Sequence, residues 1–387
     1  MSHHPASRLA DIEPFHVVEL LARARQLEAD GRDIIHMEVG EPDFPTPAPI
    51  TAAAVDAMKQ GKTLYTQALG LPELRAAIAN FYHSRYGVTV PARRIAVTNG
   101  ASGALNLAFA CLADPGREWL LADPGYPCNR HILRVYEGRP RNIPVGPESN
   151  FQPTPQLVRQ YWNTNTAGLL VASPANPTGT LLSLPEIEAL AHVCRASDGH
   201  FLVDEIYHGL TYETDAPTAC TAGDDIWVIN SFSKYFQMTG WRLGWMVIPE
   251  AYVRDVEKLA QNLVLCPSTP AQHGALAAFA PETIALLEAR RAEFRARRDF
   301  LAPALEDIGF RITARPEGAF YLYCDCSGLS DDSFTLARDL LEKAGVAATP
   351  GLDFGSNAPE RHIRFAYTTR IERLTEAVRR LATYFGR

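Results

Sequence analysis

The chain lacks the features that mark secreted, membrane and nucleic-acid-binding proteins. Its seven cysteines are scattered over 387 residues without a C-x-x-C pair, which argues against a disulfide framework or a zinc site. No apolar run approaches the length of a membrane span, and the N-terminal residues have no apolar core of a signal peptide. Basic residues number 37 against 44 acidic ones, so no overall field attracts nucleic acid or an anionic membrane. We therefore expect a cytoplasmic protein with no metal, nucleic-acid or membrane partner.

What the chain does have is a regular alternation of β-rich runs and helical patterns. This alternation predicts an α/β fold in which a mainly parallel sheet is sandwiched by helices. The expected strands are residues 95–98, 119–122, 169–172, 201–203, 227–230 and 245–248. In such sheets ligands lie beyond the carboxyl ends of the strands, so the polar segments that follow the strands are where chemistry is expected.

A long charged pattern from about Pro281 to Asp307 predicts a single helix, and the residues beyond it indicate a separate, smaller α+β unit. We expect the domain boundary near this helix. The large, ligand-binding domain is then residues 46–281, and the small domain combines residues 1–45 with residues 282–387.

Lys234 follows one of the expected strands, in the segment Ser231-Phe232-Ser233-Lys234, and Gly240-Trp241-Arg242-Leu243-Gly244 comes shortly after it. A lysine that condenses with an aldehyde must be available as the neutral amine, and hydroxyl and guanidinium groups are suitable donors to a phosphate. Taken alone, such a lysine is more often a surface residue in a polar turn. The other strand ends decide between these readings.

Three of these strand ends carry groups that suit an anionic, aromatic ligand. Asn99-Gly100-Ala101-Ser102-Gly103 joins a strand to a helix start, where free N–H groups and the helix dipole favour an anion. Asp204 emerges from an apolar strand, and a buried carboxylate is costly unless it is paired. Asp123-Pro124-Gly125-Tyr126-Pro127 places an aromatic ring at a third strand end, although a turn tyrosine packed on the core is about equally common.

Together with Ser173-Pro174-Ala175-Asn176-Pro177-Thr178-Gly179, these segments resemble the class I/II aminotransferases, which are pyridoxal phosphate (PLP) enzymes of fold type I. The resemblance runs in the same order from about residue 36 to 367. One position departs from the pattern, because Gln237 stands where a small or aliphatic residue is usual. The resemblance implies that Lys234 holds PLP as an internal aldimine and later moves the α-proton of the substrate.

The resemblance also implies a role for each remaining site residue. The phosphate is expected to bind Gly100, Ala101, Ser102, Ser231, Ser233 and Arg242, with Tyr65 reaching across from the other subunit of a homodimer. Tyr126 would stack on the ring, Asp204 would pair with its nitrogen, and Asn176 and Tyr207 would share its phenolic oxygen. Gly40 and Asn176 would contact the substrate, whose α-carboxylate would bind Arg364 rather than Arg361.

The function implied is amino-group transfer between an L-amino acid and a 2-oxo acid. One alternative is a PLP-dependent C–S β-lyase, which shares every cofactor residue. A PLP-binding transcription regulator needs an added DNA-binding domain, and the matching region begins too early in the chain to leave room for one. Ser102 stands where family members that favour aspartate often carry lysine, and Phe15 is placed to close over an apolar side chain. We therefore expect neutral or aromatic amino acids as substrates.

Overall fold

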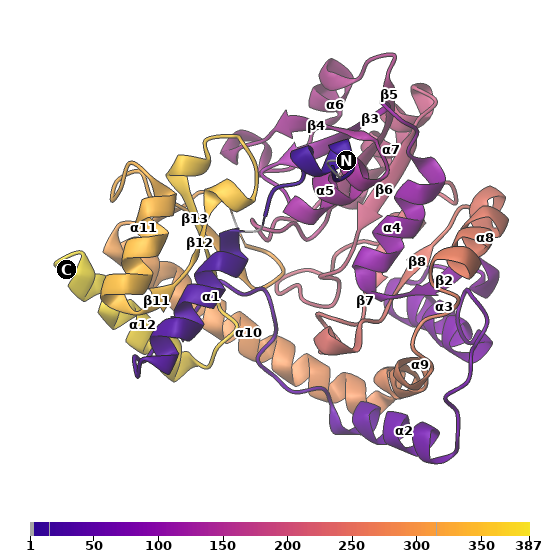
Figure 1. The fold of residues 1–387 in the computed structure, drawn as a ribbon, viewed down its shortest axis with the longest axis horizontal. Coiled ribbons are helices and arrows are strands. Elements are labelled where there is room, and N and C mark those ends of the chain that lie inside the picture. The colour runs from indigo at the N-terminus through magenta and orange to yellow at the C-terminus, as the bar shows by residue number, and fades with distance from the viewer. Residues whose placement is uncertain (1–3, 15, 315) are drawn as a thin grey trace.

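The computed structural model describes residues 4–14, 16–314 and 316–387. The chain forms two bodies, each built around its own sheet, and the long helix α10 (Pro281–Ile308) runs between them (Figure 1). In the described part of the chain, we find no helix with the length and apolarity that a membrane crossing requires.

The larger body is built on a seven-stranded sheet in the order β2-β8-β7-β6-β5-β3-β4. All pairs are parallel except those of β8, which runs antiparallel to both β2 and β7. The strands are β2 (Ile95–Thr98), β3 (Glu118–Asp123), β4 (Arg139–Pro144), β5 (Thr166–Ala172), β6 (His200–Asp204), β7 (Trp227–Ser231) and β8 (Gly244–Val247). The expected α/β fold and its six strands are confirmed. β4 was not predicted, because its sequence RPRNIP is polar and carries two prolines, which are tolerated only at a sheet edge.

The helices of the larger body pack on this sheet or on one another. They are α2 (Ala48–Lys59), α3 (Pro72–Tyr86), α4 (Gly100–Leu112), α5 (Pro127–Val135), α6 (Pro155–Tyr161), α7 (Leu184–Ala196), α8 (Val253–Leu263) and α9 (Thr269–Leu276). Among them, α2 packs on α9. Local sequence signals set several of their ends. Ser183 and Glu186 form a capping box at the start of α7, and Gly87 ends α3 in the left-handed conformation with a φ of 68°.

The smaller body holds a four-stranded antiparallel sheet in the order β12-β13-β10-β9 and a parallel pair, β1 with β11. Its elements are α1 (His16–Ala29), β1 (Ile35–His36), β9 (Arg311–Ile312), β10 (Tyr321–Asp325), α11 (Ser333–Asp339), β11 (Val346–Ala347), β12 (Thr349–Pro350), β13 (His362–Ala366) and α12 (Ile371–Tyr384). Because β1 pairs with β11 and α1 packs on β12, the N-terminal segment belongs with the C-terminal one. On this ground we propose the division into residues 46–281 and residues 1–45 with 282–387.

Asp123 joins the two bodies beside the carboxyl ends of the large sheet. Its carboxylate, at the end of β3, accepts hydrogen bonds from the backbone N–H groups of Ser356 and Asn357 and from the Ser356 hydroxyl at 2.8 Å. The N–H of Gly125 donates to the carbonyl of Phe354 at 2.8 Å. These contacts fix the loop after β12 against the strand ends, so that a cavity between the bodies has walls from both.

Candidate active site

A cavity of about 290 Å³ lies between the two bodies. Most of the side chains expected at the site reach it from different elements. Those lining it are Gly40, Ala101, Ser102, Tyr126, Asn176, Asp204, Tyr207, Ser233, Lys234, Arg242 and Arg364. The fold therefore gathers into one space residues that are spread over more than three hundred positions of the sequence.

Lys234 lies just beyond β7, with its amine pointing into the cavity. The Lys234 Nζ donates a hydrogen bond to the carbonyl of Gly40 at 2.5 Å, and it lies 5.8 Å from the centre of the Tyr207 ring. Removal from water lowers the pKa of the Lys234 amine to about 8, and the positive charges of Arg364 and Arg242 act in the same direction. The neutral amine is thus far more available than on an exposed lysine, as condensation with an aldehyde requires.

Asp204 ends strand β6, next to β7 in the sheet, and is a buried residue that lines the cavity. Its Oδ1 accepts a hydrogen bond from the backbone N–H of Ile206 at 3.0 Å. Burial raises the pKa of the Asp204 carboxyl to about 6, and Lys234 opposes that rise. A buried carboxylate that lines a cavity with so little support is stabilised by a cationic donor, such as a protonated ring nitrogen.

The N-terminus of α4 and Arg242 form a cradle of the kind an anion needs. Gly100 has a φ of 70°, and a Cβ there would lie 2.6 Å from the Arg242 Nη2, so the guanidinium packs directly on the glycine backbone. Ser102 follows in the first turn of α4, where N–H groups are free to bind an anion. Ser233 reaches the cavity, but Ser231 does not line it. The Ser231 hydroxyl donates to the Ser233 Oγ at 2.8 Å and so supports the residue that does.

Arg364, on β13, is held on several sides. Its Nη1 donates to the Asn176 Oδ1 at 2.8 Å, and its Nη2 donates to the carbonyl of Glu38 at 2.6 Å. The guanidinium lies 4.2 Å from the centre of the Tyr321 ring. The Arg364 Nε is buried and finds no hydrogen-bond partner within the described residues. A guanidinium that is held in place and has an N–H group left to donate is suited to bind a planar carboxylate.

Tyr321 is a cavity residue that sequence reasoning missed. Its hydroxyl lies 2.8 Å from that of Tyr207, and a Cβ on Gly40 would lie 2.0 Å from it, so only glycine fits at position 40. Burial raises the pKa of both tyrosine hydroxyls, which keeps them protonated and able to donate. The sequence offered no signal beyond a strand, because Tyr321 sits in the apolar run of β10.

An apolar wall was also missed. Val17, Val18 and Leu21 of α1 line the cavity, together with Val39, Leu105 and Ile206. The backbone N–H groups of His16 and Val17 donate to the carboxylate of Asp353 at 2.9 and 2.8 Å, which fixes the first turn of α1 over the cavity. Phe15, which the sequence suggested as a cover, lies outside the described residues.

Two of the singled-out residues lie elsewhere. Tyr65 is 82% exposed and does not line the cavity in this single chain, so its expected role depends on a second copy. Gln237 is buried away from the cavity, where its side chain accepts a hydrogen bond from Arg290 of α10 and its carbonyl accepts one from the Thr46 hydroxyl at 2.8 Å. The departure from the family pattern at position 237 therefore serves packing against α10.

Comparisons with known proteins agree with this geometry. The family described as aminotransferase class I and II matches residues 32–381. The chain is 38% identical to a valine–pyruvate aminotransferase of Mycobacterium tuberculosis over 97% of both chains. It is 34% identical to an aspartate/prephenate aminotransferase of Thermus thermophilus over 98% of both. A crystal structure of an aminotransferase from Mycobacterium tuberculosis superposes with a TM-score of 0.96, with 38% identity and complete coverage of both chains.

The fold and the cavity are those of a fold type I transaminase. The chain belongs to the class I and II aminotransferase family, and it is a PLP-dependent aminotransferase. The residues present fit this cofactor on structural grounds as well. Asp204 offers a buried carboxylate for which no ion pair is found among the described residues, and Lys234 offers an amine of lowered pKa. Gly100 lets the Arg242 guanidinium pack against the start of α4, where a phosphate would bind.

Proposed function

We propose that this aminotransferase acts on neutral L-amino acids with apolar side chains and on the corresponding 2-oxo acids. The apolar wall of Val17, Val18, Leu21, Val39, Leu105 and Ile206 carries the proposal. Among the described residues that line the cavity, the side chains of fixed positive charge or amine type are Lys234, Arg242 and Arg364. Each of these has an expected role at the cofactor or the α-carboxylate, so a second carboxylate on the substrate would meet no further cation among the described residues that line the cavity. A carboxylate left unpaired against apolar groups is strongly disfavoured.

The relatives are consistent with this preference without deciding it. The relative that is 38% identical is named a valine–pyruvate aminotransferase, whereas the one from Thermus thermophilus is named for aspartate and prephenate. Ser102 and the apolar wall favour the first of these substrate types for this chain.

The proposed roles of the residues follow from their positions. Arg364 binds the α-carboxylate of the substrate, and its contact with Asn176 sets the direction in which the guanidinium points. The Lys234 amine would take the proton from the substrate Cα and hold it as an ammonium ion until it is returned. A positioned base of this kind contributes roughly 10²- to 10⁴-fold in rate. When bound, PLP supplies an electron-withdrawing ring, and Asp204 would keep that ring protonated.

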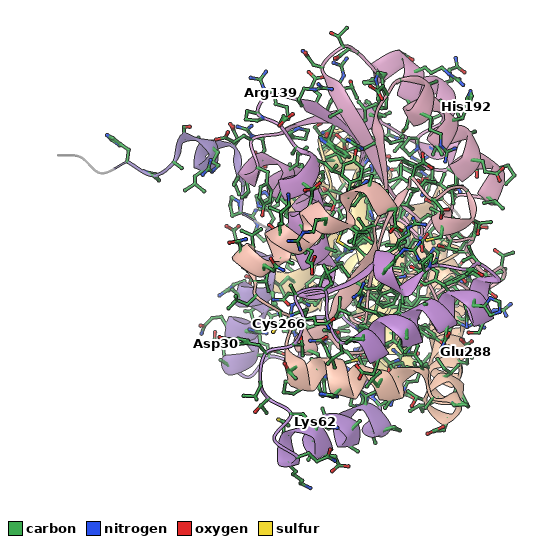
Figure 2. The ribbon with its side chains drawn as sticks, turned by 90° about the vertical axis from the view of Figure 1, so that its right-hand side faces the viewer. Asp30, Lys62, Arg139, His192, Cys266 and Glu288 are labelled. Atoms are coloured by element: carbon green, nitrogen blue, oxygen red, sulfur yellow. The ribbon has the colours of Figure 1, made fainter. Side chains whose placement is uncertain are left out.

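We further propose that the enzyme is a homodimer with composite sites. Leu64 and Tyr65 follow α2 and are 80% and 82% exposed, and Leu263 and Leu265 at the end of α8 are also exposed. Figure 2 faces this side of the molecule, with Lys62 at its lower end and Cys266 near its centre. Exposed apolar side chains gathered on one face favour an interface. The cytoplasmic location expected from the sequence stays a prediction.

A half-reaction separates amino-group transfer from β-elimination. The purified holoenzyme is mixed with leucine alone and followed by its visible absorbance. We expect the absorbance of the lysine-bound cofactor to disappear and to return when a 2-oxo acid is added. If the absorbance persists, while a cysteine conjugate yields pyruvate and ammonia, the C–S lyase alternative is correct.

A subunit mixture tests the composite site. Chains with Lys234→Ala are exchanged with chains with Tyr65→Phe, and PLP affinity is measured at the site that keeps Lys234. If Tyr65 serves the neighbouring subunit, this site receives an intact Tyr65 and binds PLP with normal affinity. If the affinity stays as weak as in the Tyr65→Phe homodimer, Tyr65 acts within its own chain.

A further inference from the structure

A line of three ionisable side chains leads from the surface to the buried region behind Arg364. His36, on β1, has its Nδ1 2.6 Å from the Oε1 of Glu38 and its Nε2 3.1 Å from the Oε1 of Glu28. Glu28 lies on α1 and is exposed, His36 is half-buried, and the Glu38 side chain has no exposed surface. The second oxygen of Glu38, Oε2, has no hydrogen-bond partner in the described structure. His36 is therefore the contact that balances a fully buried carboxylate.

Glu38 is also in direct contact with the substrate side of the cavity. Its carbonyl accepts hydrogen bonds from the Arg364 Nη2 at 2.6 Å and from the Thr349 hydroxyl at 2.9 Å. Two residues later, the carbonyl of Gly40 accepts a hydrogen bond from Lys234. The short segment from Glu38 to Gly40 thus touches both the guanidinium expected to bind the substrate carboxylate and the amine expected to move the proton. The residue that carries the buried carboxylate thus contacts Arg364 through its backbone.

The charges near His36 favour its protonated form. The hydrogen bond to Glu38 is the largest cause that raises the pKa of His36, to about 9, and Glu28 adds to it. His36 also borders a second cavity, whose other charged groups are Arg25 of α1, Glu41 and Asp43 of the following loop, and Arg373 of α12. Asp43 is paired with Arg297, and Arg373 with Asp33. Near neutral pH the partner of Glu38 is thus a cation.

We propose that His36 is a positioning residue for substrate binding: by pairing with Glu38 it neutralises the buried carboxylate, which leaves the charge of Arg364 for the α-carboxylate of the substrate. The inference rests on the proposed role of Arg364. It assigns to His36 a function that none of the cavity-lining side chains provides, because His36 itself does not touch the substrate space.

The charge argument predicts what happens without His36. A buried carboxylate that loses its cation has two ways to lower its free energy. One is to become neutral, which leaves substrate binding close to normal. The other is to interact with Arg364, where the carboxylate competes with that of the substrate. Loss of His36 should therefore make carboxylate binding weaken as the pH rises, which loss of packing alone would not do.

The experiment uses the holoenzyme and 4-methylpentanoate, a monocarboxylate that has no amino group and cannot react. Its dissociation constant is measured by calorimetry between pH 6.5 and 8.5 for the wild type, His36→Gln, Glu38→Gln and the double variant His36→Gln/Glu38→Gln. His192→Gln, an exposed histidine on α7 in Figure 2, is the matched control. Any titration of the cofactor linkage itself is common to all of these proteins, so each variant is compared with the wild type at every pH.

Relative to the wild type, we expect His36→Gln to lose affinity by about tenfold between pH 6.5 and 8.5, with uptake of a proton on binding at the higher pH. The double variant should remove this dependence, because no ionisable group remains at position 38. His36→Arg should behave as the wild type, and KM for leucine should change more than kcat. If His36→Gln fails to fold, the double variant and His36→Arg still test the proposal. If His36 had only a structural role, neither of these variants would restore binding.

Two outcomes would overturn the proposal. One is a His36→Gln enzyme whose affinity follows the wild type at every pH, and the other is a double variant as impaired as the single one. Arg364→Lys separates this failure from failure of the proposed function. If Arg364→Lys leaves binding of 4-methylpentanoate unchanged, Arg364 is not the carboxylate site, and the assignment of both residues falls. If Arg364→Lys weakens binding but His36→Gln does not, only the role of His36 is wrong.

Discussion

The two walls of the cavity are built in different ways. The cofactor wall comes from the carboxyl ends of β6 and β7 and from the start of α4, and it carries the polar groups Asp204, Lys234 and Ser102 beside Leu105 and Ile206. The substrate wall comes from α1, the segment 38–40, β10 and β13, and it is mainly apolar apart from Arg364, Glu38 and the Tyr321 hydroxyl. The groups expected to hold the cofactor thus lie on the rigid sheet of the large body, and the proposed substrate selectivity rests on side chains that the small body adds.

The largest expected effect comes from replacing Lys234 on the cofactor wall. Lys234→Ala removes the amine that we propose moves the α-proton, so the half-reaction with leucine should slow by at least ~10²- to 10⁴-fold. PLP should still bind without a covalent link, through Asp204 and the phosphate cradle. Borohydride reduction of the wild type, followed by peptide mapping, should fix PLP on Lys234 alone. Lys258→Ala, an exposed lysine on α8 paired with Asp255, is the control and should keep full activity. A reduced adduct on another lysine would disprove the assignment.

The next largest effect comes from replacing Arg364 on the substrate wall. Arg364→Ala removes the two charge-assisted hydrogen bonds proposed to hold the substrate carboxylate, each worth about 1.5 to 3 kcal/mol. Since about 1.4 kcal/mol is a tenfold change, KM for leucine should rise by ~10²-fold or more. Arg361→Ala is the matched control, because that neighbour is half exposed and pairs with Asp325 at 3.0 Å. Equal increases in KM for both variants would contradict the choice of Arg364.

The lowered pKa of Lys234 gives a pH test of the cofactor wall. Only the neutral amine condenses with the aldehyde, so the rate at which the apoenzyme takes up PLP covalently should rise with pH and level off above about 8. Below that value the rate should fall by about tenfold for each pH unit. Because folding lowers the pKa of Lys234, the charged amine destabilises the folded state. This cost grows as the pH falls from the pKa of an exposed lysine to about 8, and it stays constant below that value. A rate that keeps rising past pH 10 would mean that Lys234 titrates like an exposed lysine.

The smallest expected effect comes from shortening Leu21, one of the apolar side chains of the substrate wall. Leu21→Ala enlarges the cavity beneath α1, and kcat/KM for leucine should fall by about threefold to tenfold, because part of a contact worth about 1.5 to 3 kcal/mol is lost. The value for alanine should change less, since its side chain does not reach the wall. Leu9→Ala, at a leucine that is 52% exposed, should leave both values unchanged. A parallel fall for both amino acids would indicate a general effect on α1.

The sequence predicts the cofactor wall far better than the substrate wall, for a physical reason. The residues around Lys234, Asp204 and Asn176 act beside the strand ends that carry them, so short motifs describe them. Val17 reaches the cavity only because Asp353, 336 residues away, accepts its N–H. Such pairings between distant segments leave no local pattern.

His36 and Glu38 illustrate the same limit. No motif in the sequence marks the segment that holds their charge pair. Its significance appears when Arg364 and α1 are placed around it. Tyr321 belongs to the same class, because its hydroxyl becomes a cavity group only through its contact with Tyr207.

The specificity of the wild-type enzyme tests the central claim most directly. Leucine, phenylalanine and aspartate are supplied together at equal concentration with one 2-oxo acid, and the consumption of each gives the ratios of kcat/KM. With a substrate wall of apolar side chains and no free cation among the described lining residues, leucine or phenylalanine should exceed aspartate by at least ~10²-fold. A preference for aspartate over both neutral amino acids would contradict the account.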